Sequence, residues 1–277
     1  MIIEKTKNKI LIKNPKDFNV AQTLNCGQIF RYVIEGNTAI VFSKDKKCDI
    51  VFNEKEIEIS TKDVEYFYNF FDLSMDYGKI KQTLKKDRFL SSAVDYGYGI
   101  RIINNDEYEM LVSFIISANN NIKRIKNSIE YLCSNFGENK ETYFAFPTLK
   151  QLKTATVQDF KRAGLGYRAE QMYETVQNLT EQNIIDLKTM CPEEQLKFLV
   201  ALKGVGEKVA NCIMLFGLGV KNVFPVDTWI NKVYNNLVGT VETDRKKITR
   251  ELTNRYGKLS GFAQQYFFYY YRDNNLK

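Results

Sequence analysis

Histidine is absent from all 277 residues of the chain. Its absence excludes serine–histidine and cysteine–histidine nucleophiles, and it excludes metal sites built on imidazole. Any acid–base chemistry therefore falls to aspartate, glutamate, lysine, tyrosine or cysteine side chains.

Cysteine is scarce and irregularly spaced, at positions 26, 48, 133, 191 and 212. The number is odd and no C-x-x-C pair occurs, which argues against a disulfide framework, a structural zinc site and an iron–sulfur cluster. We therefore expect no metal or redox cofactor.

Long apolar runs are missing too, since none reaches the roughly 18 residues that a membrane span requires. The N-terminus has no positively charged segment followed by an apolar stretch, so it is not typical of a signal peptide. These absences predict a protein of the reduced cytoplasm. The abundance of lysine, asparagine and isoleucine suggests an AT-rich bacterial genome.

The residues that are present favour a folded protein with a polyanionic partner. Hydrophobic residues make up 44% of the chain, enough for one large or two ordinary domains. The net charge is +7 and the pI about 8.9, values that suit nucleic acid but also occur in proteins that bind none. The 17 tyrosines and 19 phenylalanines can stack on bases or fill a core.

The chain up to about residue 60 has the pattern of short β-strands. Strand-like runs occupy residues 10–12, 29–34, 39–42, 50–52 and 57–59, and turn residues stand at 35–37 and 53–55. The connections are short, which predicts an antiparallel sheet. The last run alternates charged and apolar side chains, so that strand should have one solvated face.

Helical spacing replaces this pattern after Thr61 and continues to the C-terminus. Thr156 with Asp159 resembles a capping box at the start of one helix. No low-complexity linker separates the two parts. We predict an α+β fold, with an N-terminal antiparallel sheet domain and flanking helices over residues 1–98, and a helical domain over residues 99–277.

A glycine-containing turn between two apolar helices is the most informative segment. Residues 196–201 end one helix, residues 202–206 form a tight turn, and residues 207–216 form the next helix. Gly204 and Gly206 leave backbone N–H groups uncovered at a helix N-terminus, where the helix dipole favours anions. A phosphate of a nucleic acid is the expected ligand.

Lys208 lies in the first turn of the second helix, beside apolar Val209 and Ala210 and one turn before Cys212. The dipole there disfavours the protonated ammonium, and a neutral amine is what a nucleophile requires. The alternative is an ordinary solvated lysine, one of 40 basic residues. The G-x-G-x-K context favours the nucleophile.

Asp227 ends the segment FPVD and precedes another apolar helix. It can be a plain N-cap, or it can present a carboxylate to the site of Lys208, and the two interpretations are compatible. We therefore predict that a phosphate-binding turn, an amine nucleophile and an acid–base group lie close together.

The segment LKGVGEKVANC followed by VFPVD resembles the signature of the helix–hairpin–helix DNA glycosylases, with lysine where bifunctional members carry it. Four other segments resemble the 8-oxoguanine DNA glycosylase/AP lyases of that superfamily and occur in the family's order. They are CGQIFR at 26–31, SANNNIKRI at 117–125, GLGYRA at 164–169 and GFAQ at 261–264. The resemblance spans nearly the whole chain and implies a sheet domain followed by a helical domain.

This resemblance implies two catalytic residues. Lys208 would attack C1′ of the sugar and form a Schiff base, and Asp227 would share the lysine proton and stabilise positive charge on the sugar. Gly204 and Gly206 would present the hairpin to the DNA backbone.

The resemblance also implies a pocket for an extruded base. Gly27 would accept a hydrogen bond from N7–H of 8-oxoguanine, a position where normal guanine has only a lone pair. Gln264 would read the Watson–Crick edge, and Phe268 and Cys212 would sandwich the ring. As alternatives, Gly27 could be a turn glycine, and Gln264 and Phe268 could be an ordinary packing pair one helical turn apart.

A third group of residues would replace the contacts that the DNA loses when the base is extruded. Asn119, Arg124 and Arg168 would hold the widowed cytosine, whose O2 and N3 are acceptors, and Tyr167 would enter the base stack. As alternatives, the arginines could contact phosphate or solvent, Asn119 to Asn121 could cap the helix that follows, and Tyr167 could be a core residue.

Three features depart from the best-known relatives. Trp229 stands two residues after the aspartate, where those relatives carry histidine, which leaves the contact expected of that histidine open. Phe262 replaces a more common tryptophan. The chain lacks the C-terminal cysteine cluster of the endonuclease III and adenine-glycosylase branches, which argues against membership of those branches.

We conclude that the sequence predicts a bifunctional enzyme that excises 8-oxoguanine opposite cytosine and nicks the abasic site by β-elimination. Its partner would be double-stranded DNA containing oxidised guanine, with no membrane partner, and we expect a monomer at the bacterial nucleoid. One alternative is a glycosylase for another damaged purine, although such enzymes often lack the lysine. The other is a non-catalytic DNA-binding protein that uses only the hairpin.

Overall fold

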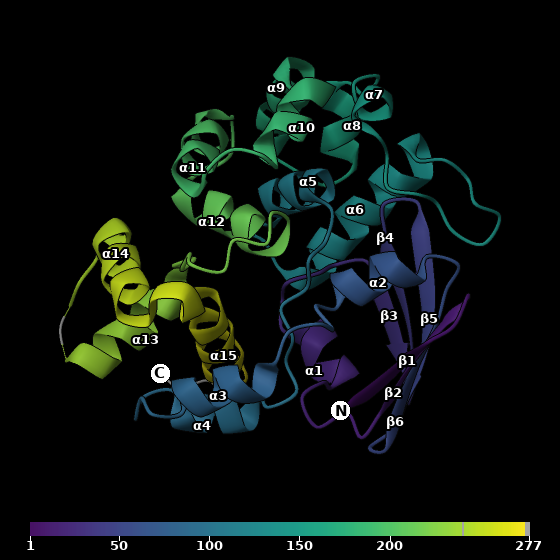
Figure 1. Cartoon of the computed structure of the whole chain (residues 1–277). Helices are drawn as coiled ribbons and strands as arrows, with labels where there is room; N and C mark the ends of the chain where they lie inside the picture. The colour runs from purple at the N-terminus through teal and green to yellow at the C-terminus, as the bar shows by residue number, and fades with distance from the viewer. Residues whose placement is uncertain (240, 275–277) are drawn as a thin grey trace.

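The computed structural model describes residues 1–239 and 241–274, which form an antiparallel sheet and a larger group of helices (Figure 1). The strands are β1 (Ile2–Lys5), β2 (Lys9–Lys13), β3 (Tyr32–Glu35), β4 (Thr38–Ser43), β5 (Lys46–Phe52) and β6 (Glu56–Ser60). The helices of the first hundred residues are α1 (Val20–Asn25), α2 (Val64–Phe70), α3 (Tyr77–Leu84) and α4 (Ser91–Tyr96).

The rest of the described chain is helical. The helices are α5 (Glu107–Ser117), α6 (Ile122–Phe136), α7 (Leu149–Leu152), α8 (Val157–Arg162), α9 (Arg168–Asn178), α10 (Glu181–Leu187), α11 (Pro192–Ala201), α12 (Glu207–Phe216), α13 (Thr228–Val238), α14 (Arg245–Tyr256) and α15 (Ser260–Asp273), with a 3-10 turn η1 (Gly257–Leu259) before α15. The expected capping box of Thr156 and Asp159 is present at the start of α8.

The sheet has the strand order β1-β2-β6-β5-β4-β3, with every neighbouring pair antiparallel. Its buried face is a row of isoleucines in register, in which Ile59 pairs with Ile10 of β2 and with Ile50 of β5. Helices α1 and α2 supply Leu24 and Phe67 to the same core. The predicted antiparallel sheet is thus confirmed, and β6 has the alternating exposure that its sequence indicated.

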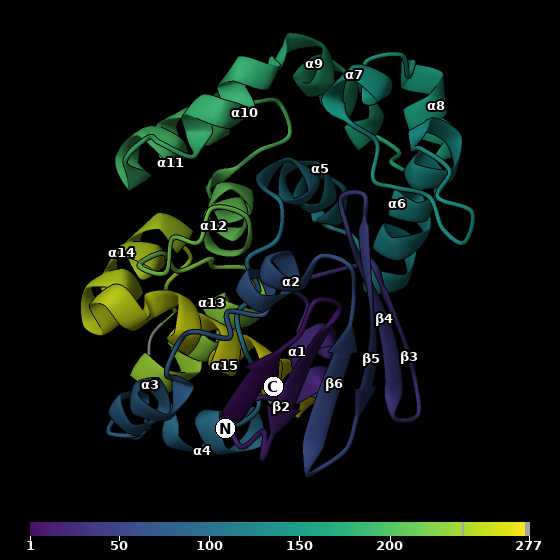
Figure 2. The ribbon, with the colours of Figure 1, turned by 45° about the vertical axis from the view of Figure 1, so that its right-hand side comes forward.

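A second core lies among the helices. Helix α5 runs through its centre and contacts α6, α9 and α12, and ten of its residues are buried. The helices α3 and α4 precede residue 98 but contribute buried residues to this second core, and α4 packs beside α15 (Figure 2). Helices from both sides of residue 98 therefore share one core, and the division of domains at that residue stays a prediction.

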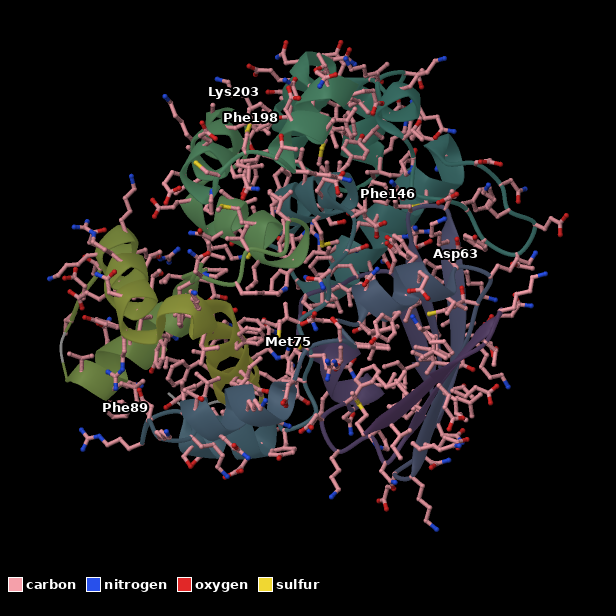
Figure 3. The ribbon with its side chains drawn as sticks, viewed as in Figure 1. Asp63, Met75, Phe89, Phe146, Phe198 and Lys203 are labelled. Carbon is pink, nitrogen blue, oxygen red and sulfur yellow. The ribbon has the colours of Figure 1, made fainter. Side chains whose placement is uncertain are left out.

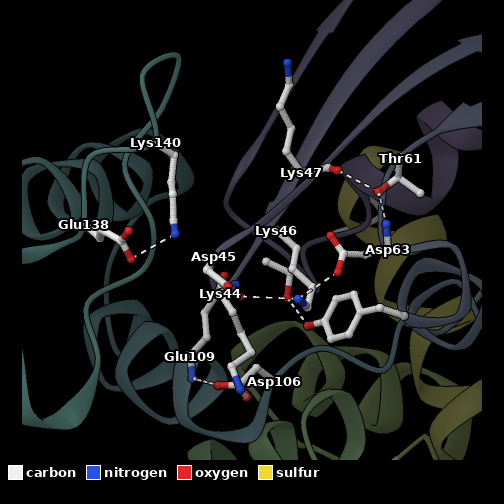
Figure 4. A network of polar contacts seen from close by, with 12 residues as sticks. Lys44, Asp45, Lys46, Lys47, Thr61, Asp63, Asp106, Glu109, Glu138 and Lys140 are labelled. Carbon is white, nitrogen blue, oxygen red and sulfur yellow. Dashed lines mark hydrogen bonds and ion pairs between the residues drawn. The ribbon is translucent and has the colours of Figure 1, made fainter. Parts of the chain in front are cut away.

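Polar contacts join the sheet to the helices. The turn between β4 and β5 approaches α5, where the Lys44 backbone N–H donates to Glu109 Oε2 at 2.7 Å and Lys44 Nζ pairs with Asp106 at 3.1 Å (Figure 4). Phe146, after α6, donates its backbone N–H to the Lys44 carbonyl at 2.7 Å (Figure 3). The two cores are therefore held in a fixed relation by directional bonds.

Three elements differ from the sequence prediction. Residues 29–31 were expected to begin a strand, but β3 begins at Tyr32. The preceding loop is held by side chains instead: Gln28 donates to the carbonyls of Thr23 and Arg101, and Arg31 Nη2 donates to the Phe144 carbonyl at 2.6 Å. Strand β1 and helix α1 were not predicted, because β1 has no buried face and α1 is under two turns long.

Candidate active site

The predicted hairpin connects α11 to α12 and presents free backbone groups. Gly204 has φ +78°, and a Cβ there would lie 3.2 Å from Gln171 Oε1, so glycine is required. Gly206 is the exposed N-cap of α12, and a Cβ there would meet nothing within 4 Å. The first backbone hydrogen bond of α12 runs from the Ala210 N–H to the Gly206 carbonyl at 2.9 Å. The N–H groups of residues 206–208 precede this bond and are available to an anion. Lys203 marks this edge of the molecule in Figure 3.

Lys208 is the second residue of α12 and is only half-buried. Its neighbours Val209 and Ala210 are in the core, so the helix is anchored while the lysine side chain remains accessible. The Nζ atom lies 5.6 Å from the centroid of the Phe114 ring on α5. The amine is therefore not sealed in hydrocarbon, as an idle core lysine would be.

Asp227 is the N-cap of α13, and its Oδ1 accepts a hydrogen bond of 2.9 Å from the Ile230 backbone N–H. Residues Phe224 and Val226 before it are buried, which fixes where the helix begins. The capping interpretation is thus correct for one carboxylate oxygen. Asp227 also lines a cavity together with Lys208, so the two interpretations hold at once.

Two adjoining cavities contain both residues. A cleft of about 960 Å³ lies between the end of α5, the start of α12, the start of α13 and α15. A small recess of about 50 Å³ shares five lining residues with it: Gly27, Phe114, Lys208, Asp227 and Phe268. The lysine and the carboxylate, 19 positions apart in the sequence, therefore face one open site.

The recess is lined by all four residues expected to bind a base. Gly27 comes from the loop after α1 with φ +82°, Cys212 from α12, and Gln264 and Phe268 from α15. A Cβ on Gly27 would lie 3.0 Å from Phe268 Cε1, so this glycine sets the width of the recess.

Two polar groups of the recess have unusual surroundings. Gln264 is 6% exposed, and its Oε1 has no hydrogen-bond partner among the described residues. A buried acceptor without a donor is costly, so Oε1 is a ready partner for a donor on a ligand. Burial raises the pKa of the Cys212 thiol, an effect that nearby Lys208 partly offsets. Cys212 is therefore a neutral thiol at one wall.

Of the residues expected to contact the opposite DNA strand, only Asn119 is among the lining residues of the cleft. Asn119 lines the cleft and has φ +49°, and Arg124 is exposed on the first turn of α6. Tyr167 is 63% exposed at the N-cap of α9, which excludes the core alternative. Asn121, rather than Asn119, caps α6 by accepting from the Arg124 backbone N–H at 3.0 Å.

Arg168 is buried and already engaged. Its guanidinium donates to the carbonyls of Ala118 at 2.6 Å, Asn119 at 2.7 Å and Leu165 at 3.0 Å. The bonds to Ala118 and Asn119 tie the loop that carries Asn119 to the start of α9. Arg168 thus positions that loop whether or not it also reaches a base.

The sequence interpretation missed two residues that line the cavities, Gln265 in the recess and Arg272 in the cleft. Gln265 Nε2 donates to the Cys26 carbonyl at 2.6 Å, and Arg272 Nη1 donates to the Asn25 carbonyl at 3.0 Å. The Arg272 guanidinium also lies 5.5 Å from the Phe268 ring centroid. The helical spacing of 264, 268 and 272 was the signal that could have identified Arg272.

Comparison with known proteins agrees with this geometry. Residues 10–111 match the family "8-oxoguanine DNA glycosylase, N-terminal domain", and residues 112–258 match "HhH-GPD superfamily base excision DNA repair protein". The chain belongs to the HhH-GPD superfamily of base excision DNA repair proteins. The second match covers the hairpin, Lys208 and Asp227 but ends before α15.

Individual known proteins are similar over nearly the full chain. The "N-glycosylase/DNA lyase" of Saccharomyces cerevisiae is 28% identical over 91% of this chain and 82% of its own length. The 8-oxoguanine glycosylase/lyase of Clostridium acetobutylicum, in complex with double-stranded DNA containing cytosine opposite 8-oxoG, is 36% identical. It superposes with a TM-score of 0.92 over 100% of this chain and 99% of that one. Its apo form is 37% identical, with a TM-score of 0.89 over 98% and 99%.

Within residues 1–239 and 241–274 of this chain, no helix is both long enough and apolar enough to cross a lipid bilayer.

Proposed function

We propose that the protein is a bifunctional DNA repair glycosylase that excises 8-oxoguanine opposite cytosine from double-stranded DNA and then nicks the abasic site. The observation that carries this proposal is the meeting of Lys208 and Asp227 in one cleft, beside a recess lined by Gly27 and Gln264. Because both faces of a stacked base are covered, an enzyme acting at C1′ must first extrude the nucleotide.

In the proposed reaction Lys208 Nζ attacks C1′ of the extruded nucleotide as the bond from C1′ to N9 breaks. The base departs with the bonding electron pair and takes up a proton, and Asp227 stabilises the positive charge that develops on the sugar. The lysine nitrogen then forms a Schiff base with the opened sugar. Loss of a proton from C2′ expels the 3′ phosphate, and water finally hydrolyses the imine to regenerate the amine.

Recognition of the base is assigned to the recess. The Gly27 carbonyl accepts from N7–H of 8-oxoguanine and repels the N7 lone pair of guanine. Gln264 offers its buried Oε1 to a donor of the Watson–Crick edge. Cys212 and Phe268 hold the ring between them, which requires the neutral thiol that burial favours.

Recognition of the other strand is assigned to the loop that carries Asn119 and to the first turns of α6 and α9. Asn119, Arg124 and Arg168 contact the widowed cytosine, and Tyr167 fills the gap left in the stack. The exposure of Tyr167 supports this role, because a wedge must project from the surface before DNA binds. Gly204 and Gly206 present backbone N–H groups to a phosphate.

A borohydride trapping experiment tests the proposal. An 8-oxoguanine:cytosine duplex should give a covalent adduct with the wild-type protein and none with Lys208→Gln. Asp227→Asn should retain duplex binding but lose most of the adduct. Tight binding without adduct or nick would instead support a non-catalytic DNA-binding protein. An adduct with an alkylated purine but none with 8-oxoguanine would support a glycosylase for another damaged purine.

The proposal extends to organisation and location. We place the boundary between the sheet domain and the helical domain at residue 98, and we expect a monomer because one active site and one DNA footprint suffice. The expected location is the bacterial cytoplasm, at the nucleoid through DNA binding. Sedimentation of the protein with and without duplex tests the monomer.

A further inference from the structure

The charge in the cleft is strongly unbalanced. Its described lining includes the basic residues Lys123, Lys208, Arg245 and Arg272, against the single carboxylate of Asp227. A concave surface of one charge sign concentrates the field and attracts ions of the other sign. Three of the four cations lie on α6, α12 and α15, whose segments already carry expected roles. Arg245 is the exception.

Arg245 reaches the cleft from α14, of which it is the first residue. Its Nη2 donates to Thr228 Oγ1 at 3.1 Å, so the guanidinium lies against the first turn of α13, next to Asp227. The hydrogen bond uses one of the five guanidinium N–H groups. The remaining donors are available to a ligand in the cleft.

Arg245 also differs from its neighbours in its ion pairing. Arg272 pairs with Asp273 at 2.7 Å, and the next two residues of α14, Lys246 and Lys247, pair with glutamates at 3.8 and 2.7 Å. Within residues 1–239 and 241–274, no carboxylate forms an ion pair with Arg245. A planar cation with free paired donors suits the oxygen atoms of a phosphate.

We propose that Arg245 binds a backbone phosphate adjacent to the extruded nucleotide and so holds the sugar in register with Lys208. This inference rests on the proposed function and adds a positioning residue to it. Trp229, two residues after Asp227, also lines the cleft, but its indole carries no positive charge. The positive charge beside the start of α13 therefore comes from Arg245 of α14 and not from the residue at position 229.

The experiment measures binding of an 8-oxoguanine:cytosine duplex in the Lys208→Gln background, where no strand is cut. Arg245→Ala should weaken binding roughly ten-fold or more, since a charge-assisted hydrogen bond is lost. The slope of log K against log salt should fall by about one, the signature of one phosphate contact. Arg245→Lys should keep the salt slope but bind more weakly than arginine.

Arg250 is the matched control, because it is exposed on the same helix but does not line the cleft. Arg250→Ala should leave the affinity within about two-fold of the parent protein, the scale expected of a distant surface charge. Thermal unfolding of Arg245→Ala should match the parent, since the side chain is exposed.

Two results separate failure of this inference from failure of the proposed function. Wild-type protein that forms the borohydride adduct, combined with an Arg245→Ala variant of unchanged affinity and salt slope, overturns the role of Arg245 alone. Equal losses in Arg245→Ala and Arg250→Ala also overturn it, because the effect is then one of general charge. Absence of the wild-type adduct overturns the proposed function itself.

Discussion

The side-chain amide of Gln265 donates a 2.6 Å hydrogen bond to the backbone carbonyl of Cys26, 239 positions earlier in the chain. The bond fastens α15 to the loop that carries Gly27. The neighbouring Gln264 lines the recess as Gln265 does, but its Oε1 has no partner in the described part of the chain. Two consecutive glutamines thus differ in their bonding, since Gln265 is used by the fold and the Gln264 acceptor is not.

The two glutamines should therefore respond oppositely to substitution by leucine. Gln265→Leu leaves the buried Cys26 carbonyl without its donor and should lower the free energy of unfolding by about 1–3 kcal/mol. Gln264→Leu removes a buried acceptor that the fold does not use and should leave stability nearly unchanged, while excision of 8-oxoguanine falls. Urea unfolding and single-turnover excision measure the two effects. Equal destabilisation by both substitutions would contradict this interpretation.

Gly27→Ala should block the recess while sparing the lysine. The added Cβ would lie 3.0 Å from Phe268 Cε1, on a backbone with φ +82°. Excision of 8-oxoguanine should fall about ten-fold or more, since the misfit is costlier than a lost methylene contact. Borohydride trapping on a duplex with a preformed abasic site should persist, because no base has to enter.

Gly36→Ala is the control for backbone strain. Gly36 has φ +58° in the turn between β3 and β4, with nothing within 4 Å of the added atom. Gly36→Ala should lower the free energy of unfolding modestly, because alanine is strained at positive φ, and it should leave excision unchanged. A similar loss of excision in both variants would show that strain, not the width of the recess, is responsible.

The buried Glu109 should make stability depend on pH. Burial raises its pKa from 4.5 to about 7. Between these values the unfolded chain releases the proton and the native state keeps it, so the free energy of unfolding should fall as pH rises from about 4.5 to 7. Glu109→Gln keeps an acceptor for the Lys44 N–H and should flatten this slope. Urea unfolding at pH 5 and pH 8 compares the two proteins.

Substitutions of Arg124 and Arg168 should distinguish an effect on recognition of the opposite base from an effect on stability. Arg168→Ala leaves the carbonyls of Ala118 and Asn119 without a donor, while the Leu165 carbonyl keeps the Arg168 backbone N–H, and should destabilise the protein by about 2–3 kcal/mol. Arg124→Ala removes an exposed side chain and should change stability by less than about 0.5 kcal/mol. Both should weaken the preference for cytosine, measured as excision opposite each of the four bases. An unchanged preference in Arg124→Ala would contradict its assignment.

Much of the site was predictable because its pieces are local in sequence. The hairpin around Gly204 and Gly206, the start of α12 at Glu207 and the N-cap at Asp227 each depend on a few adjacent residues. Turn glycines and caps act through their own backbone, so the pattern alone identifies them. The positions of Gly27 and Gln264 needed the resemblance to a family, since neither has a distinctive local pattern.

The elements that were predicted wrongly depend on distant partners. Residues 29–31 have a strand-like composition, but the loop is determined by contacts of Gln28 and Arg31 with segments about 70 and 110 residues away. Strand β1 forms because β2 offers it an edge, with Ile3 opposite Ile12. Such pairing depends on the tertiary fold and overrides local preference.

The sequence by itself determined the order of sheet and helices, the chemistry available without histidine, and the glycine turn that precedes Lys208. These follow from periodicity, composition and backbone preference, which act over a few residues. Only the tertiary structure decided that α15 closes the recess with Gln265 on the Cys26 carbonyl, and that Arg245 of α14 lies against the start of α13 beside Asp227. Contacts between distant segments form only when a shared core brings them together, and no local pattern records them.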